Sequence, residues 1–196
     1  MDPVAICNLG LSFFGDVTIM SLNDESQAAQ YCKTNYDPSR RAVLAEREWT
    51  FAVKRILLNM TTETAPLNAS LRYYTIPDKC IRLINVFDVN ETDVNYRREG
   101  NRIVTDHYNE EIAATYTHDE TNNNLFSALF DQLLAAHIAK NIAVPLTGDI
   151  DTMVAMAQLY QDNLDRATAS DALQGSREML AKSRMEETRR HHIPIV

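Results

Sequence analysis

The sequence contains no apolar run of about 18 residues, the length that a membrane-spanning helix needs, and its first residues lack the basic-then-apolar pattern of a signal peptide. Both absences predict a soluble protein without a membrane span, made in a cytoplasm. Glycine is scarce as well: five residues in 196 leave little material for a glycine-rich phosphate loop. Because the HExxH, GxSxG and P-loop motifs are also missing, the sequence predicts a protein that is not an enzyme.

Cysteine pairs are missing too. The three cysteines, Cys7, Cys32 and Cys80, are odd in number and far apart, with no CxxC spacing and no histidine at ligand spacing. We therefore expect free, mostly buried thiols, with neither a disulfide nor a metal site. No cofactor is predicted.

Positive charge is in deficit, because 19 Lys and Arg face 27 Asp and Glu, for a net charge of -8. General nucleic-acid binding needs clustered cations that neutralise phosphates, so this balance argues against it. The charge is also uneven: residues 176–196 carry five Lys and Arg against three Glu, which leaves 14 minus 24, or -10, for the residues before them. The last residues therefore form a separate electrostatic segment.

What the sequence does contain is typical of a folded α+β protein. Hydrophobic residues make up 45% and charged residues 23%, close to globular averages. The apolar periodicity predicts a helical bundle whose first part is residues 1–50 and whose second part is residues 121–175. An inserted antiparallel β module at 51–120 separates the two parts, and an extended C-terminal tail follows at 176–196.

Two helices are predicted before the strands. The first begins after the capping carboxylate of Asp2. The second, residues 25–48, begins at a capping box formed by Asp24 and Gln27. Pro38 lies inside it, and because proline removes a backbone donor and clashes with the preceding turn, we expect a kink or a break just before it.

After Trp49 the apolar period becomes alternating, and β-rich runs follow up to about His118. Short turns separate these runs, and Glu99-Gly100-Asn101 is predicted to close a hairpin. The runs are residues 71–76, 80–89, 96–98, 102–105 and 112–116.

Helix returns at Asn122–Asn124, which offer caps, and this third helix is expected to end at Pro145–Gly148. A fourth helix, capped by Asp149 or Thr147, is expected to reach Ala172. The polar tail that follows buries little by itself, so we expect it to be disordered or extended until a partner covers it.

The helical stripes also predict the core. Trp49 is expected to anchor this core, in preference to stacking on a base or ligand. His137 lies on the most apolar helix, so we expect a core or interface histidine that is hydrogen-bonded to backbone. The predicted core residues are Cys32, Val43, Trp49, Leu129, Leu133, Ala136 and Met153.

Several short segments resemble, in their order, those of one known family, and together they cover about Ala5 to Leu164. They are Asn8-Leu9-Gly10, Gly15-Asp16, Ser21-Leu22-Asn23-Asp24, Arg40-Arg41-Ala42-Val43-Leu44, Trp49-Thr50-Phe51-Ala52, Tyr74-Thr75-Ile76-Pro77-Asp78 with Arg82-Leu83, Arg102-Ile103-Val104-Thr105-Asp106, and Ala135 to Ala143 followed by Pro145-Leu146-Thr147-Gly148. In this order they make the chain resemble the tail tubular protein A, or head-to-tail adaptor, family of short-tailed (podovirus-type) bacteriophages.

This resemblance implies a structural virion protein at the head–tail interface, made in the host cytoplasm. A ring of twelve copies would lie under the portal protein, stabilise the packaged genome, receive a tail nozzle protein similar to tail tubular protein B, and leave a channel for DNA ejection. An acidic channel wall repels the DNA backbone, so DNA is expected to pass without specific binding.

Two sets of contacts are expected within such an assembly. The helices should carry most contacts between neighbouring subunits, and Arg40, Arg41 and Tyr160 are candidates to reach across. The tail should dock on the portal through cations and an apolar terminus. Its candidate residues are Arg177, Lys182, Arg184, Arg189, Arg190, Ile193, Ile195 and Val196. His191 and His192 lack further ligands, so we expect them to be solvated or to contact the partner, with no metal.

Two alternatives remain open on the sequence. One is a related head-completion connector of a long-tailed phage, which typically lacks such a β module. The other is a small metal-dependent hydrolase, which would need Asp106, His107, His118 and Asp119 to converge within hydrogen-bond reach.

Overall fold

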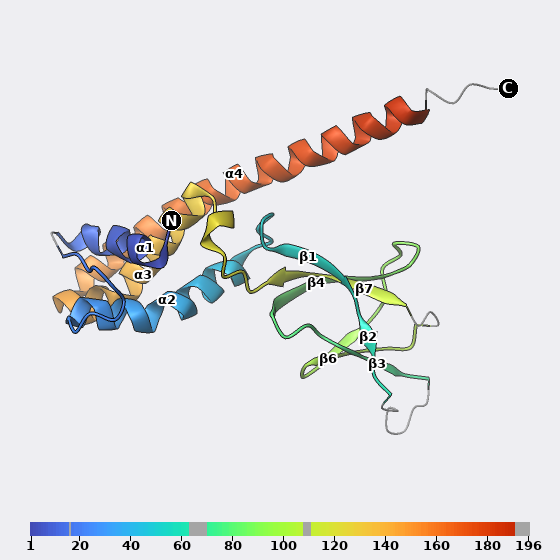
Figure 1. Ribbon diagram of the computed structural model, residues 1–196, viewed down its shortest axis with the longest axis horizontal. Coiled ribbons are helices and arrows are strands. Elements are labelled where there is room, and N and C mark those ends of the chain that lie inside the picture. The colour runs from blue at the N-terminus through green and yellow to red at the C-terminus, as the bar shows by residue number, and fades with distance from the viewer. Residues whose placement is uncertain (16, 63–69, 108–110, 191–196) are drawn as a thin grey trace. The chain divides into compact units, whose positions relative to one another are not determined.

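The computed structural model describes residues 1–15, 17–62, 70–107 and 111–190, with side chains up to residue 174. The chain divides into two compact units, which are treated separately: unit 1 joins Met1–Val43 to Asn122–Val196, and unit 2 is Leu44–Thr121. Unit 1 is helical, whereas unit 2 consists mainly of antiparallel strands (Figure 1). The predicted α+β class is therefore confirmed. Among the described residues, no helix combines the length and the apolarity needed to cross a membrane.

Helix α1 (Pro3–Leu11) opens unit 1 and continues into the short 3-10 helix η1 (Ser12–Phe14). The Asp2 carboxylate accepts a hydrogen bond from the Ala5 amide at 2.7 Å, as predicted for a cap. α1 packs closely on α3 (Ala128–Thr147), because a Cβ added at Gly10 would lie 2.9 Å from the Ala135 carbonyl oxygen. Only glycine fits this approach without a shift.

Helix α2 (Gln27–Glu46) begins later than predicted, and its cap is a different residue. Ser26 is the cap, since its hydroxyl accepts from the Ala29 amide at 3.2 Å. The predicted capping box is wrong: Asp24 turns back to accept from the Met20 and Ser21 amides at 2.9 and 3.0 Å.

The proline in α2 does not break the helix. Residues on both sides of Pro38 are buried, including Cys32, Tyr36, Ser39 and Val43. Packing along the whole stripe outweighs the roughly 3 kcal/mol that an internal proline costs, since tertiary burial provides most helix stability in proteins. The break, one of the two outcomes expected there, is therefore absent.

Helix α3 begins later than predicted, but it ends within the segment expected to stop it. Asn122–Asn124 cap only a short 3-10 helix, η2 (Asn123–Leu125), and Ser127 caps α3 by accepting from the Phe130 amide at 3.1 Å. Pro145 lies in the last turn of α3, and the helix ends two residues after it, at Thr147. Gly148 ends α3 in a left-handed conformation (φ 72°) that favours glycine.

Helix α4 (Ile150–Arg190) is much longer than predicted, with 41 residues. Asp149 caps it, as expected. The end expected at Ala172 and the extended conformation expected for the tail are wrong through Arg190. One internal glycine costs only about 1 kcal/mol, and the strong helix formers beyond it continue the helix. At 1.5 Å per residue, α4 spans about 60 Å and α3 about 30 Å, so roughly half of α4 extends past the end of α3.

The core of unit 1 brings together segments from both ends of the chain. Cys7 of α1 and Cys32 of α2 are fully buried and their thiols are hydrogen-bonded. Hydrogen bonds also join Asn123 to Tyr36 at 2.8 Å and Asn141 to Ser39 at 3.2 Å. The core predicted at Cys32, Val43, Leu133 and Ala136 is confirmed by full burial. Leu129 and Met153 are only half-buried, because each lies near the first turn of its helix, where neighbours cover one side less completely.

Unit 2 contains two antiparallel sheets. The first has the order β1-β7-β4, formed by β1 (Val53–Leu57), β7 (Ile112–His118) and β4 (Cys80–Asp88). The second has the order β2-β3-β6-β5, formed by β2 (Asn59–Met60), β3 (Arg72–Thr75), β6 (Arg102–Thr105) and β5 (Arg97–Glu99). The predicted hairpin is confirmed, with Gly100 at φ 60° in the turn between β5 and β6.

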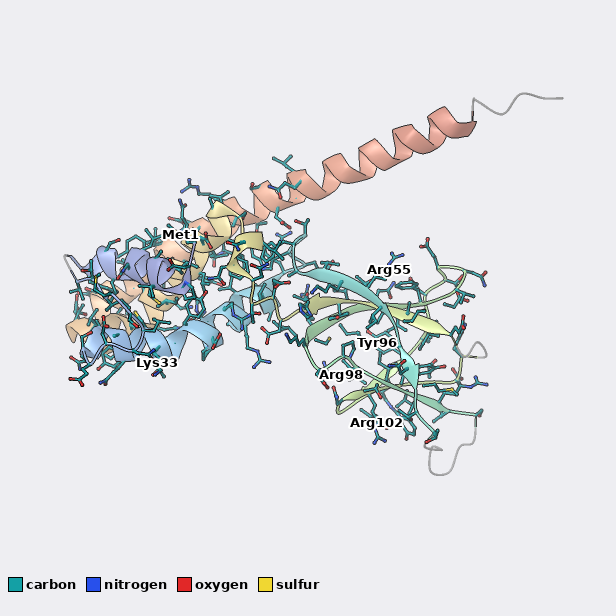
Figure 2. All side chains as sticks on the ribbon, in the orientation of Figure 1. Met1, Lys33, Arg55, Tyr96, Arg98 and Arg102 are labelled. Atoms are coloured by element: carbon teal, nitrogen blue, oxygen red, sulfur yellow. The ribbon has the colours of Figure 1, made fainter. Side chains whose placement is uncertain are left out.

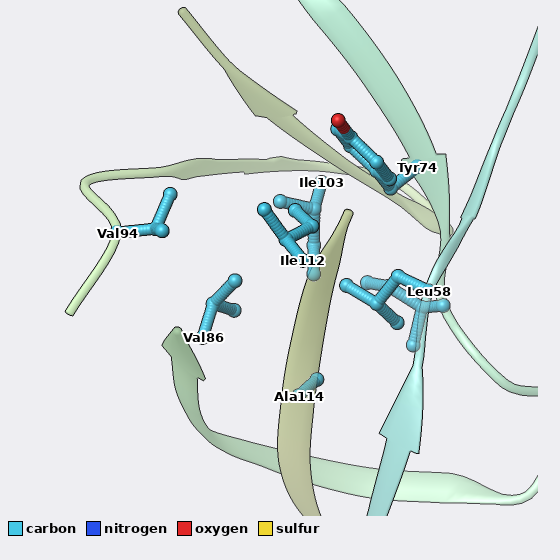
Figure 3. Close-up of a cluster of buried hydrophobic side chains, with 8 residues drawn as sticks. Leu58, Tyr74, Val86, Val94, Ile103, Ile112 and Ala114 are labelled. Atoms are coloured by element: carbon cyan, nitrogen blue, oxygen red, sulfur yellow. The ribbon is translucent and has the colours of Figure 1, made fainter. Parts of the chain in front are cut away.

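A cluster of buried side chains lies between these sheets (Figure 3). Strands of both sheets contribute, and Leu58 belongs to the bend through which the chain passes from one sheet to the other. The cluster consists of Leu58, Tyr74, Ile76, Val86, Val94, Ile103, Ile112 and Ala114.

The two ends of unit 2 lie side by side. The His118 amide donates to the Ala52 carbonyl at 2.8 Å, and Val53 pairs with Thr117. Trp49, just before β1, is 1% exposed and stacks on Phe51 with ring centroids 6.4 Å apart. The predicted burial of this tryptophan is confirmed, although it lies in unit 2 and not in the helical unit.

Candidate functional site

The residues proposed for a hydrolase do not converge. His107 Nε2 lies 3.5 Å from Asp88 Oδ2, at the end of β4 where Asp88 pairs with Ile112. His118 pairs with Cys80 at the opposite end of the same ladder, six residues of β7 and about 20 Å from Ile112. Asp106 is next to His107, so it lies too far from His118 for both to bind one metal ion. The convergence that the hydrolase alternative needs is therefore absent.

His118 is partly buried and packs against a neighbouring side chain. Burial lowers the pKa of its imidazole below the ordinary value, and the nearby Lys54 charge lowers it further. Its ring lies edge-on to Tyr116, with centroids 6.1 Å apart. Within the described part of the chain, no three His, Cys, Asp or Glu side chains gather as metal ligands.

Tyr160 belongs to the packing of α4 on α3. It is 8% exposed, its ring lies edge-on to His137 at 5.0 Å, and Lys140 Nζ lies 4.5 Å from its ring centroid. The expectation that Tyr160 reaches a neighbouring subunit is therefore wrong, because its position on α4 directs it toward α3. His137 is an interface histidine as expected, but its partner is the Asn141 amide at 3.2 Å. Burial, with a smaller effect of Lys140, lowers the His137 pKa to about 4.

The two arginines of α2 have different environments. Arg40 is 3% exposed, and its guanidinium lies 3.3 Å from the Asp37 carboxylate. Arg40 is buried, so it is not a surface residue that reaches across, and that expectation is wrong. Arg41 is exposed, so its expected role stays a prediction.

Of the tail residues expected to contact a portal, only those up to Arg190 lie within the described residues. Arg177, Lys182, Arg184, Arg189 and Arg190 lie on the C-terminal half of α4, where the structure describes the backbone only. His191, His192, Ile193, Ile195 and Val196 lie outside the described residues.

A surface that the sequence analysis did not identify lies on β1. Leu57 is 64% exposed and is in register with Ala113 of β7, which is in register with Phe87 of β4. The small alanine between two larger side chains leaves a cavity of about 350 Å³. We call it the β1 groove; it is lined by Arg55, Ile56, Leu57, Phe87, Asp88, Val89, Glu91, Glu111 and Ala113.

The lining of the β1 groove combines apolar and charged side chains. Arg55 lies 4.6 Å above the Phe87 ring and 3.0 Å from Glu91. Asp88 accepts from the Thr92 and Asn90 amides, which hold the pKa of its carboxyl below the usual range. Two of the three carboxylates in the lining thus have partners, since Glu91 pairs with Arg55 and Asp88 is bound by backbone amides.

A second cavity, of about 220 Å³, shares Ile56 and Leu57 with the β1 groove. It is bounded by Leu58 and Asn59 and by residues 75–78. β1 therefore separates two cavities. The signal in the sequence is the run of consecutive apolar residues at 56–58. Successive side chains of a strand point to opposite faces, so such a run places apolar groups on both faces of β1.

A basic strand lies elsewhere on unit 2. β5 is exposed at all three positions, and Tyr96 before it is 38% exposed. Figure 2 labels Tyr96, Arg98 and Arg102 in this region, and Arg55 on β1. Arg97 pairs with Glu99 at 2.6 Å, and Arg98 donates to the Gly100 carbonyl at 3.1 Å.

Among the residues described, the histidines and carboxylates considered for catalysis lie at opposite ends of one strand ladder. In comparisons with known proteins, no protein-family model and no curated protein matches this chain.

Proposed function

We propose that this chain is a head-to-tail adaptor of a bacteriophage, a structural subunit that assembles into a ring of twelve copies between the portal and the tail nozzle. In the virion, this ring stabilises the packaged genome and leaves a channel through which DNA passes without specific binding. The proposal rests on the ordered resemblance of the segments given above to the adaptor family of short-tailed phages.

One structural observation supports the proposal most. A helical unit built from both ends of the chain holds α1, α2, α3 and α4, while a β module is inserted between α2 and η2. This is the organisation that the resemblance implies. A head-completion connector typically lacks such a module, so this second phage protein is the weaker candidate.

The long α4 supports a docking role for the C-terminus. Its second half extends about 30 Å beyond the end of α3. Five cations lie on this half, against three glutamates. A projecting helix with net positive charge can bind an acidic groove on a partner.

The experiment combines the full-length chain with the portal protein of its phage and images the product by electron microscopy. We expect twelvefold rings on the portal. Removal of residues 176–196 should abolish docking, whereas Leu173→Ala, just before the removed segment, should leave docking unchanged. Absence of rings with the full-length chain, or unchanged docking after the truncation, would contradict the proposal.

A further inference from the structure

Two thiols meet in the core of unit 1. Cys7 lies on α1 and Cys32 lies on α2, and neither side chain is exposed to solvent. The Cys7 thiol donates a hydrogen bond to the Cys32 sulfur, so the two side chains are in contact. Both residues are free thiols in the structure. Two cysteines whose side chains already meet can be bridged with little movement of the backbone.

The two thiols differ in reactivity. The hydrogen bond between them raises the pKa of Cys7, and burial raises it further. The same bond lowers the pKa of Cys32, although burial opposes this effect. Because the thiolate is the nucleophile in disulfide exchange, Cys32 is suited to attack and Cys7 to resolve the product. Cys80 of unit 2 provides an internal comparison, since burial raises the pKa of its thiol.

Helix α1 controls access to the pair. It has only nine residues, so it depends on packing for its stability and can open locally. Since both cysteines are fully buried, an oxidant reaches them when α1 opens. A bond between residues that are 25 positions apart in the chain (32 minus 7) would then prevent further opening.

We propose that Cys7 and Cys32 are a redox-sensitive pair, which forms an intramolecular disulfide and fastens α1 to α2 when the chain meets a small-molecule disulfide such as oxidised glutathione. The Cys32 thiolate attacks one sulfur of oxidised glutathione, breaks its S–S bond and releases one glutathione. Cys7 then loses its proton, and its sulfur displaces the second glutathione from Cys32. The two cysteines lose two protons and two electrons, and one oxidised glutathione is reduced to two thiols.

The surroundings decide when the bond forms. A cytoplasm keeps thiols reduced, whereas disulfides form and persist outside the cell. With the adaptor role proposed above, the chain assembles in a reducing cytoplasm and meets an oxidising medium after the particles are released. The bond therefore forms once α1 is already in place. This timing rests on the proposed function, whereas the bond itself does not.

Thiol counting tests the bond. The purified full-length chain is incubated with excess oxidised glutathione, denatured, alkylated and analysed by mass spectrometry. We expect two of the three thiols to be lost, with a mass decrease of about 2 Da for the two hydrogen atoms removed. Digestion should yield a peptide pair that joins Cys7 to Cys32, with Cys80 alkylated. Three alkylated thiols, a glutathione adduct as the final product, or a disulfide that contains Cys80 would overturn the inference.

Two variants test the order of attack. Cys7→Ala lacks the resolving thiol, so it should retain one glutathione on Cys32. Cys80→Ser is the matched control, and it should still lose both of its thiols on oxidation. An unmodified Cys32 in the Cys7→Ala variant contradicts the assignment of Cys32 as the attacking residue.

Unfolding tests whether the bond fastens α1. The urea midpoint, followed by circular dichroism, should rise by about 1 M in the oxidised wild type, because the bond restricts the unfolded chain. The amides of α1 should also exchange with solvent more slowly. Cys7→Ala should have the same midpoint with and without a reducing agent. If the oxidised wild type unfolds at the same urea concentration as the reduced wild type, the bond does not stabilise the fold and the inference is wrong.

The outcomes separate this inference from the adaptor role. If rings form on the portal but no Cys7–Cys32 bond appears, only the redox pair is wrong. If the bond forms but the full-length chain makes no ring on the portal, the adaptor role is wrong, and only the timing of the bond fails with it.

Discussion

A single glycine determines how closely α1 approaches α3. Gly10 lies in α1, and the position of a Cβ there is 2.9 Å from a backbone oxygen of Ala135. A backbone atom cannot move aside as the end of a long side chain can, so an added methyl group must separate the helices.

Gly10→Ala is therefore expected to lower the free energy of unfolding by about 1–3 kcal/mol. Helix propensity alone predicts the opposite sign, a gain of about 1 kcal/mol. Urea denaturation followed by circular dichroism measures the change, with Ala5→Gly as a control for propensity in the same helix. A stabilised Gly10→Ala protein would show that the helices separate without cost.

His137 should make the stability of unit 1 depend on pH. Its pKa of about 4 in the folded state lies below the ordinary 6.5, because burial disfavours the charged imidazole. Between these values the unfolded chain binds the proton and the folded chain does not, so the free energy of unfolding falls as pH drops from about 6.5 toward 4. Above pH 6.5 this contribution is constant.

His137→Gln should remove that part of the pH dependence. Denaturant unfolding at pH 7 and at pH 5 gives the decrease in the free energy of unfolding for each protein. The difference between the two decreases removes the contribution of the carboxyl groups, which both proteins share. We expect the wild type to lose more stability than the variant. Equal losses would mean that the imidazole is protonated in the fold without penalty.

At this scale, the sequence predicts burial better than it predicts partners. Periodicity identified Cys32, Val43 and Leu133 as core residues, since a helical stripe faces one direction. It could not show that Tyr160 contacts His137. Such a contact depends on the rotation and register of two helices, which a single stripe leaves undetermined.

At the scale of helices and strands, capping groups decide where each element begins. Asp149 accepts from the Asp151 and Thr152 amides, both at 3.1 Å, and from the Thr152 hydroxyl at 2.5 Å. These bonds satisfy amides at the start of α4 that have no helical partner.

Asp149→Ala is expected to lower the free energy of unfolding by about 1 kcal/mol. Asp149→Asn keeps an acceptor oxygen and should retain most of the stability. Thermal unfolding of the two variants measures the difference. Equal melting temperatures for the alanine and asparagine variants would show that the cap contributes nothing.

The extent of the elements was less predictable than their existence. The strands and the hairpin at Gly100 follow from alternation and turn residues. Apolar periodicity does not predict the length of α4, because the last part of the helix has few apolar residues. Helix formers can nevertheless continue a helix that is already nucleated. The β1 groove could not be predicted, because it depends on which residues of three strands come into register.

For the whole molecule, the relevant feature is that unit 2 has its own buried cluster. All eight residues of the cluster belong to this unit. The start of its first strand lies beside the end of its last strand, since Val53 pairs with Thr117. A segment with a separate core and adjacent ends has the properties of an independent domain.

The segment 44–121, expressed alone, is therefore expected to fold. A dispersed amide proton spectrum and a cooperative urea transition would demonstrate this. Ile103→Asp, which places a charge in the cluster, should abolish both signals. If segment 44–121 gives the narrow spectrum of an unfolded chain, its fold depends on the helical unit.

The hydrogen bond between Ala52 and His118 has an evolutionary consequence. Because the polypeptide enters and leaves the β module at neighbouring residues, insertions, deletions or complete replacement of the intervening strands need not displace any helix. Related chains can therefore diversify the module to suit different binding partners, while the residues that hold the helices together are inherited unchanged.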